Sequence, residues 1–389
     1  MNKKIIFNSI NIITIISLLL FAVNLDFSSV KAKDLDSNRK IVVFKEGLSN
    51  SEKEAVIDVV GARKIKNLDL VKAAVINVPS KTVLEKLSSN PAVLRIDDDV
   101  IVEAAGQVLP WGVNQVDAEL VWPLGNTANP IKVSIIDTGT SKNHPDLKNN
   151  VKGGVNTISP SKSFSDDNGH GNHVSGIVAA VNNSIGVVGV AHQADLYGVK
   201  VLNRYGSGFL SDVIEGIEWS INNGMQVINM SLTTSSDVQS FHDAVTAAKN
   251  AGVVVVAAAG NASGPVTFPA VYSEAIAVSA TDSSNNIASF SNRGPEIDLA
   301  APGVDILSTY KDSSYAIISE TSMSAPHVAG VAALVLNTPV GTYDANLNGK
   351  WDPDEVQKKM QDRAVDLGAA GFDNLYGWGI VNAYNAVQP

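Results

Sequence analysis

Hydrophobic and polar positions divide the chain into three stretches with different patterns. The first begins with Lys3 and Lys4 and continues with an apolar run over residues 12–23. The second, residues 33–105, alternates short apolar runs with amphipathic ones, whereas the third consists of short, almost wholly apolar runs separated by helical patterns. Each pattern predicts a different kind of segment.

The first 32 residues have the order of an export signal: a basic start, an apolar run and small residues around Lys31-Ala32 where cleavage can occur. An uncleaved membrane anchor is the alternative. The purely apolar run is shorter than the roughly 20 residues that a membrane span needs. We therefore expect residues 1–32 to be removed and the mature protein to be secreted, without stable association with a membrane.

The second stretch predicts a small α+β unit. Apolar runs and helical periodicity place strands at 40–44, 73–78 and 93–96, helices at 51–60 and 82–88, and an extended tail at 100–102. This order of elements favours a split βαβ, ferredoxin-like unit.

The third stretch predicts a mostly parallel sheet of the α/β class, covered by helices on both faces. Its runs are almost wholly apolar, which is typical of strands buried on both sides, and helical patterns lie between them. The predicted strands are 133–136, 195–201, 227–230, 253–258 and 275–278. We find no internal repeat and no low-complexity linker.

Composition narrows the functions that the chain can have. Of its 389 residues, 45% are apolar and 17% are charged, which permits a sizeable core and excludes a disordered chain. The formal charge of −10 disfavours nucleic acid as a partner. The absence of cysteine excludes disulfides, thiolate zinc sites and a cysteine nucleophile. For an exported domain without disulfides, bound calcium is the expected stabiliser.

Polar residues follow the predicted strands at the edge where α/β proteins bind ligands. Asp137 ends the strand 133–136, and Asn261 follows the strand 253–258. His170 stands between glycines at the start of a helix of small residues. A zinc pair formed by His170 and His173, or a simple helix cap, is the alternative, but neither accounts for the glycines.

Ser322 stands at the N-terminus of a predicted helix, because Pro326 suits a first turn and an apolar run follows. Free backbone N–H groups and the helix dipole at that place favour a developing negative charge. Serine before a helix is usually only a cap. Aspartate, histidine and serine in this order, with a strand-end asparagine, are far more specific than any one of them.

These motifs resemble those of the subtilisin-like serine endopeptidases, the subtilase family. Asp137-Thr138-Gly139 is similar to the family's aspartate motif, and Thr321-Ser322-Met323 to its serine motif. His170-Gly171-Asn172-His173 is similar to its histidine motif, with Asn172 where threonine is usual. The resemblance implies that residues 33–105 are an inhibitory propeptide and residues 106–389 the peptidase domain.

The family implies catalytic roles for four residues. Ser322 would attack the scissile carbonyl, His170 would take its proton and return it to the leaving amine, and Asp137 would fix the imidazole. Asn261 and the backbone N–H of Ser322 would hold the oxyanion. His173 and His327 are assigned to packing. The resemblance further implies protein or peptide substrates, the chain's own propeptide as inhibitor, and self-maturation near residue 105; we expect a monomer.

By resemblance, two segments bind the substrate as an added strand, and one further residue lines the main specificity pocket. The residues implied are Gly206, Ser207, Gly208, Ser231, Leu232, Thr233 and Thr267. None is charged, so we expect a preference for apolar or small side chains. Thr233 replaces the glycine that is usual in the family and should narrow the pocket mouth.

Two signals predict calcium. The first is a resemblance to the family's tight site, whose ligands would be Gln107, Asp146, Val181, Asn183, Ile185 and Val187. The second stands without the family, because residues 344–355 fit the twelve-residue EF-hand loop. Its oxygen ligands would come from Asp344, Asn346, Asn348, Lys350, Asp352 and Glu355. A solvated turn is the alternative for this loop.

Glu320 departs from the family, in which glycine normally precedes Thr321. A carboxylate within about 6 Å of the reacting carbonyl would disfavour the oxyanion and favour protonated His170. A side chain turned to solvent, where screening leaves little effect, is the alternative. The rival hypothesis is therefore a degraded subtilase that binds peptides without cleaving them efficiently. The presence of all four catalytic residues favours the enzyme.

Overall fold

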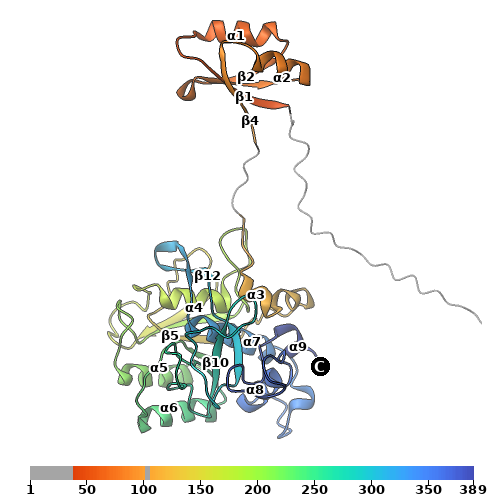
Figure 1. Ribbon diagram of the computed structural model, residues 1–389. Helices are drawn as coiled ribbons and strands as arrows, with labels where there is room; N and C mark the ends of the chain where they lie inside the picture. Colours follow the sequence, from red (N-terminus) through yellow and green to blue (C-terminus); the bar gives the residue numbers. More distant parts are fainter. Residues whose placement is uncertain (1–37, 101–105) are drawn as a thin grey trace, which may run out of the picture. The chain divides into compact units, whose positions relative to one another are not determined.

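The computed structural model describes residues 38–100 and 106–389, which belong to two compact units divided at residue 105 (Figure 1). The predicted signal, the extended tail beyond residue 100 and the expected cleavage point lie outside the described residues.

The small unit is a four-stranded antiparallel sheet with two helices. Its elements are β1 (Arg39–Phe44), α1 (Asn50–Val59), β2 (Arg63–Leu68), the 3₁₀ turn η1 (Asp69–Val71), β3 (Ala73–Asn77), α2 (Lys81–Ser88) and β4 (Val93–Asp98). The strand order β2-β3-β1-β4 is the ferredoxin-like order. Ile57 of α1 and Leu87 of α2 are fully buried against Val42 and Ile76 of the sheet.

Sequence reasoning missed strand β2 because its pattern is that of an edge strand. Its sequence, RKIKNL, is mostly charged, and most of its side chains are exposed. Charged edge strands are common because they discourage pairing with other chains. The backbone of β2 pairs with β3 alone within the sheet.

The large unit contains the remaining elements. Its strands are β5 (Lys132–Asp137), β6 (Val151–Asn156), β7 (Asp195–Lys200), β8 (Val227–Met230), β9 (Val254–Ala258), β10 (Ala275–Thr281), β11 (Leu299–Pro302), β12 (Ile306–Thr309) and β13 (Tyr315–Ile318). Its helices are α3 (Trp111–Gln115), α4 (His170–Ala179), α5 (Leu210–Asn222), α6 (Gln239–Asn250), α7 (Thr321–Leu336), α8 (Pro353–Asp362) and α9 (Ala383–Val387).

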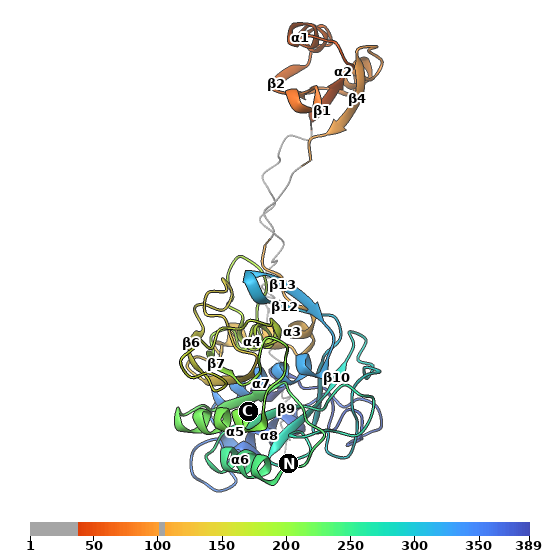
Figure 2. The ribbon, with the colours of Figure 1, turned by 90° about the vertical axis from the view of Figure 1, so that its left-hand side faces the viewer.

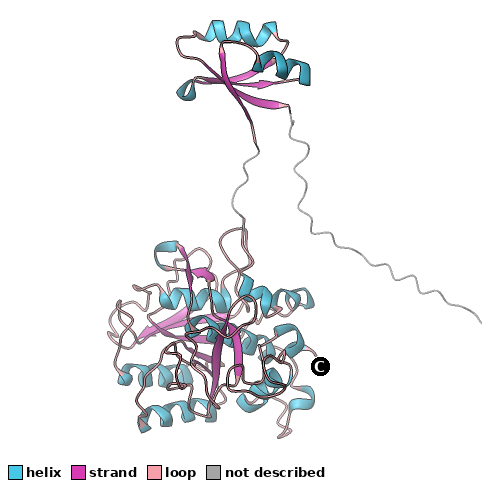
Figure 3. Cartoon of the chain, in the orientation of Figure 1, coloured by secondary structure: helices cyan, strands magenta, loops and turns pink. Residues whose placement is uncertain are grey.

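Seven strands form one parallel sheet in the order β11-β10-β9-β8-β5-β7-β6, which confirms the predicted fold class (Figure 3). Successive strand residues point to opposite faces. Val133 and Ile135 of β5 therefore pack in a core with α4 and α7, whereas Ile136 packs in a second core with α5 and α6. The two cores lie on the two faces of the sheet.

Helix α7 runs through the larger core, and all its residues except the last, Leu336, are buried. A helix that is apolar on all sides is stable only when it is buried all round. Its small residues allow close packing: a Cβ at Gly330 would lie 2.7 Å from Val190. Figure 2 shows α7 amid the sheet and its covering helices. The first turn of α7 is thereby held in a fixed position.

Strands β6, β11, β12 and β13 were not predicted. Strand β6 carries two glycines and lies at the sheet edge, and β12 and β13 form a separate antiparallel pair. Such short or glycine-containing segments have little periodicity to read. Within the described parts of the chain, no helix is long and apolar enough to span a membrane.

Candidate active site

Asp137 and His170 form a hydrogen-bonded pair at the carboxyl end of β5. Nδ1 of His170 lies 2.8 Å from Oδ1 and 2.9 Å from Oδ2 of Asp137. The Asp137 side chain is fully buried, and the backbone N–H of Thr138 donates to its Oδ1 at 2.6 Å. With Nδ1 engaged in this way, the other ring nitrogen of His170, Nε2, faces the cleft.

Two glycines allow the turn after β5 to pack against the first turn of α4. Gly139 has a φ of +116°, and a Cβ there would lie 2.4 Å from the carbonyl oxygen of Phe164. A Cβ at Gly171 would lie 2.1 Å from the carbonyl oxygen of Gly139. Any larger residue would separate Asp137 from His170, which accounts for the glycines in both motifs.

Asp166, which sequence reasoning did not single out, holds the start of α4. Its Oδ1 accepts hydrogen bonds from Thr138 Oγ1 and from the backbone N–H groups of Asn168 and Gly169, each at 2.9 Å. Its Oδ2 accepts from the backbone N–H of Asn172 at 2.8 Å. The carboxylate therefore satisfies N–H groups at the helix start, and an aspartate four residues before a helical histidine is the signal that could have revealed it.

Asn172, the departure from the usual threonine, binds the turn after Asp137 at two points. Its Oδ1 accepts from the backbone N–H of Ser141 at 2.7 Å, and its Nδ2 donates to Ser141 Oγ at 3.1 Å. The asparagine side chain thus ties α4 to the turn that follows β5.

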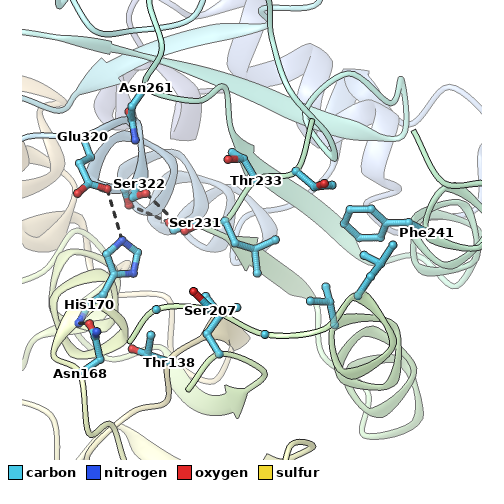
Figure 4. A pocket seen from close by; sticks show the side chains of 17 residues that line it. Thr138, Asn168, His170, Ser207, Ser231, Thr233, Phe241, Asn261, Glu320 and Ser322 are labelled. Carbon is cyan, nitrogen blue, oxygen red and sulfur yellow. Dashed lines mark hydrogen bonds and ion pairs between the residues drawn. The ribbon is translucent and has the colours of Figure 1, made fainter. Parts of the chain in front are cut away.

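Ser322 lies in the first turn of α7 and lines the same cleft as His170. Its Oγ donates to the carbonyl oxygen of Ser231 at 3.4 Å, and Ser231 Oγ donates to the carbonyl oxygen of Ser322 at 2.8 Å. The start of α7 is therefore bound directly to the segment after β8. Figure 4 shows Ser322 and Glu320 above the imidazole of His170.

Asn261 is oriented by Thr321. Its Oδ1 accepts from both the backbone N–H and the hydroxyl of Thr321, each at 2.8 Å. The next backbone N–H, that of Ala262, donates to Oδ1 of the buried Asn292 at 2.9 Å. With its oxygen held by Thr321, the Asn261 amide directs its nitrogen toward the cleft, as Figure 4 shows.

Glu320 places a second carboxylate beside the imidazole. Its Oε2 lies 3.8 Å from Nε2 of His170, and its side chain is 41% exposed. Burial lowers the pKa of His170, but the negative charges of Asp137 and Glu320 outweigh it and raise that pKa to about 10. The interaction with His170 in turn lowers the pKa of Glu320, so its carboxyl is ionised at neutral pH.

The cleft contains most of the predicted substrate-binding residues. Gly206, Ser207, Gly208, Ser231, Leu232 and Thr233 all line it, together with Asp137's neighbour Thr138 and with Asn168. Thr267 is not among the lining residues: its hydroxyl donates to the carbonyl oxygen of Ala259 at 3.1 Å instead. This hydrogen bond links the Thr267 side chain to the residue that follows β9, and its role in the specificity pocket stays a prediction.

An apolar end of the cleft was missed by sequence reasoning. Leu202, Leu210, Val213 and Phe241 line it. Leu210 and Val213 are three residues apart on α5, so they share a helix face, and this spacing is the signal that could have revealed them.

The residues predicted to bind calcium by resemblance lie together. Nε2 of Gln107 donates to the carbonyl oxygens of Val181 at 2.8 Å and Val187 at 2.9 Å. Asp146 accepts from Nδ2 of Asn183 at 2.8 Å, and Asn183 Oδ1 accepts from the backbone N–H of Ile185 at 2.7 Å. The expected oxygen of Gln107 instead accepts from the backbone N–H of Asn183, so the structure presents its amide nitrogen to those carbonyls.

The EF-hand-like loop is closed by its own side chains. Asp344 accepts from the backbone N–H groups of Asn348 and Gly349, each at 2.9 Å. Asp352 Oδ2 accepts from the amides of Asn346 and Asn348. Glu355, at the start of α8, accepts from the backbone of Ala345 at 2.8 Å and of Asp352 at 3.0 Å. Side-chain oxygens thus turn toward the inside of the loop, with Gly349 at a φ of +74° in its turn and Lys350 following it.

Among residues 38–100 and 106–389, no three His, Asp or Glu side chains form a metal-binding group. The site predicted by resemblance therefore depends on amide and backbone carbonyl oxygens beside the one carboxylate of Asp146. The loop 344–355 depends on carboxylate and amide oxygens together with a backbone carbonyl. Both donor sets suit calcium.

His173 and His327 are fully buried and bind backbone carbonyls, in agreement with a packing role. Nε2 of His173 lies 3.0 Å from the carbonyl oxygens of Ile306 and Ala316, and Nδ1 of His327 lies 2.8 Å from that of Met323. Burial lowers the pKa of each to about 4, so both are neutral at neutral pH.

Comparisons with known proteins identify the family. Residues 128–379 match the model of the subtilase family. An alkaline protease of Alkalihalobacillus alcalophilus is 44% identical over 306 residues, which cover 78% of this chain and 77% of that protein. Subtilisin Savinase of Lederbergia lenta is 46% identical over 283 residues, 72% of this chain and 100% of that protein. Subtilisin E of Bacillus subtilis strain 168 is 40% identical over 387 residues, 95% of this chain and 98% of that protein. The chain therefore belongs to the subtilase family and is a subtilisin-like serine endopeptidase.

Proposed function

We propose that Asp137, His170 and Ser322 are the catalytic residues of this endopeptidase. The observation that carries the proposal is the Asp137–His170 hydrogen bond of 2.8 Å in the cleft that Ser322 lines. Nε2 takes the proton of Ser322 Oγ as the oxygen bonds to the scissile carbonyl carbon. The same proton passes to the leaving amine, and water then releases the acyl group by the reverse sequence. Asp137 stabilises the imidazolium at each stage.

The oxyanion is held by Nδ2 of Asn261 and the backbone N–H of Ser322. Two features support these donors: Thr321 fixes the Asn261 amide, and Ser322 lies at an N-terminus where backbone N–H groups have no partner within the helix. Because both donors are held before the substrate binds, little reorganisation is needed as the charge develops.

The substrate binds as an extended strand along Gly206–Gly208 and Ser231–Thr233. Both segments line the cleft, and the apolar end formed by Leu210 and Phe241 favours an apolar side chain several residues before the scissile bond. Thr233 narrows the cleft nearer to Ser322.

Two calcium ions stabilise the large unit in this proposal. Gln107, with its amide turned over, joins Asp146, Val181, Asn183, Ile185 and Val187 at one site, and Asp344, Asn346, Asn348, Lys350, Asp352 and Glu355 form the other. Bound calcium would supply charge that neutralises the carboxylates and would link distant segments. It takes no part in catalysis.

The precursor matures itself. Residues 1–32 direct secretion, and residues 33–105 serve as inhibitor and are removed by the enzyme's own activity. The small unit supports the second role, because it is compact and has a ferredoxin-like strand order.

Hydrolysis of casein by the refolded precursor tests the proposal, with Ser322→Ala as the control. Clearing by the parent and none by the variant is the expected result. Binding of peptides without cleavage by the parent would favour the degraded subtilase instead.

A further inference from the structure

Glu320 is the single acidic side chain among the described residues that line the cleft. Figure 4 shows Glu320 and Phe241 at opposite ends of this lining, with His170 and Ser322 next to Glu320. The segments that in the proposed function bind the substrate before the scissile bond line the cleft from Ser322 toward Phe241. A chain that crosses Ser322 therefore leaves toward Glu320.

The carboxylate of Glu320 is accessible and weakly engaged. Its side chain is 41% exposed, and the described part of the chain offers it one ion-pair partner, His170. The 3.8 Å separation exceeds hydrogen-bond length, so the contact is a loose ion pair. A cation brought by the substrate can therefore compete for this carboxylate.

The contact opposes catalysis while it lasts. Nε2 of His170 is the atom that must accept the proton of Ser322. When the imidazole is charged, the carboxylate of Glu320 attracts the N–H group at Nε2. In this structure the Ser322 hydroxyl donates to Ser231. A cation that draws Glu320 away frees Nε2 for Ser322.

We propose that Glu320 is a specificity-determining residue that selects substrates with lysine or arginine immediately after the scissile bond. The proposal rests on the proposed function of Ser322 and His170 and adds a substrate class to it. The rest of the described lining carries no other charge except that of His170, so this preference is independent of the apolar end of the cleft.

The test compares peptides that are identical before the scissile bond and carry lysine, acetyl-lysine or glutamate after it. Acetyl-lysine keeps the length of lysine and removes its charge. We expect kcat/KM for the lysine peptide to exceed that for acetyl-lysine by about two- to fivefold, the range of a partly exposed ion pair. The glutamate peptide should be the poorest, and the ratio should fall as salt is added.

Glu320→Gln should bring the ratio of kcat/KM for the lysine peptide to kcat/KM for the acetyl-lysine peptide close to one. Glu218→Gln should keep the parent's ratio. Glu218 is the matched control because it is exposed on α5 and does not line the cleft. Equal kcat/KM values for the three peptides in the parent, or a ratio unchanged in Glu320→Gln, would overturn the proposal. Failure of the parent to cleave any peptide would instead overturn the proposed function.

Discussion

Replacing Glu320 with glutamine should move the acidic limb of the pH–rate profile to lower pH. As the general base of the proposed function, His170 must be neutral to accept a proton, so kcat/KM should rise as the pH passes upward through its pKa. Three titratable groups act on this imidazole: Asp137 at Nδ1, Glu320 at Nε2, and His173 one turn along α4. The two carboxylates raise the pKa of His170 to about 10, and glutamine removes one of them.

The size of the shift follows from the distance. At 3.8 Å between Oε2 and Nε2, two unit charges interact by about 1 to 4 kcal/mol for effective dielectric constants of 80 to 20. Since 41% of the Glu320 side chain is exposed, screening favours the lower end of this range. One pKa unit corresponds to about 1.4 kcal/mol, so we expect the limb to move by about one pH unit.

The assay is kcat/KM for a peptide without charged side chains, measured from pH 6 to 11 at constant ionic strength for the parent, Glu320→Gln, Glu320→Gly and Glu218→Gln. Glu320→Gly separates the effect of charge from any effect on the backbone. The two Glu320 variants should also be faster on the plateau, because the oxyanion no longer faces a carboxylate. Superimposable profiles of all four proteins would refute the reasoning and show that solvent screens Glu320 fully.

Four further outcomes are expected. Ser322→Ala should accumulate as unprocessed precursor in a host without other proteases; maturation of this variant, followed by gel electrophoresis, would contradict the role of Ser322. The double variant Asp344→Ala and Glu355→Ala should bind one calcium ion fewer in calorimetry and unfold at a lower temperature. An unchanged number of bound ions would show that the loop 344–355 is a surface turn that does not bind calcium. Thr233→Gly should raise kcat/KM for peptides with phenylalanine before the scissile bond by about tenfold relative to kcat/KM for peptides with alanine at that position. A methyl-sized change in a pocket contributes about 1 to 3 kcal/mol. The pKa of buried His327 lies near 4, so between about pH 6.5 and 4 only the unfolded state takes up a proton at this residue, and the free energy of unfolding falls as the pH falls. His327→Gln should remove up to about 3 kcal/mol of this loss, measured by denaturant titration at each pH. An unchanged loss of stability in the variant would show that other groups cause it.

The sheet could be predicted because its strands are apolar on both faces and end in recognisable polar residues. Strand β5 is such a case, with Asp137 directly after four apolar or small residues. Strand β2 could not be predicted in the same way, because an exposed edge carries charges that the pattern of a buried strand excludes.

At the candidate site, residues on short motifs were easier to foresee than the contacts between motifs. The glycines beside His170 indicated close packing, and Gly171 indeed lies against Gly139. The orientation of Thr267 depends on a hydrogen bond to Ala259, and that of Gln107 on two carbonyls more than 70 residues away, which no local pattern encodes.

The hydrogen bonds around Asn261 have a consequence for chemical ageing. Asparagine deamidates when the backbone nitrogen of the next residue attacks the side-chain carbonyl carbon. Here that nitrogen, in Ala262, is bound to Asn292, and the side-chain oxygen is held twice by Thr321, so neither reactant is free to move onto the other. The product would be an aspartate, whose negative charge would face the oxyanion of the proposed mechanism. The same hydrogen bonds that orient the amide should therefore slow its deamidation and extend the working lifetime of the protein.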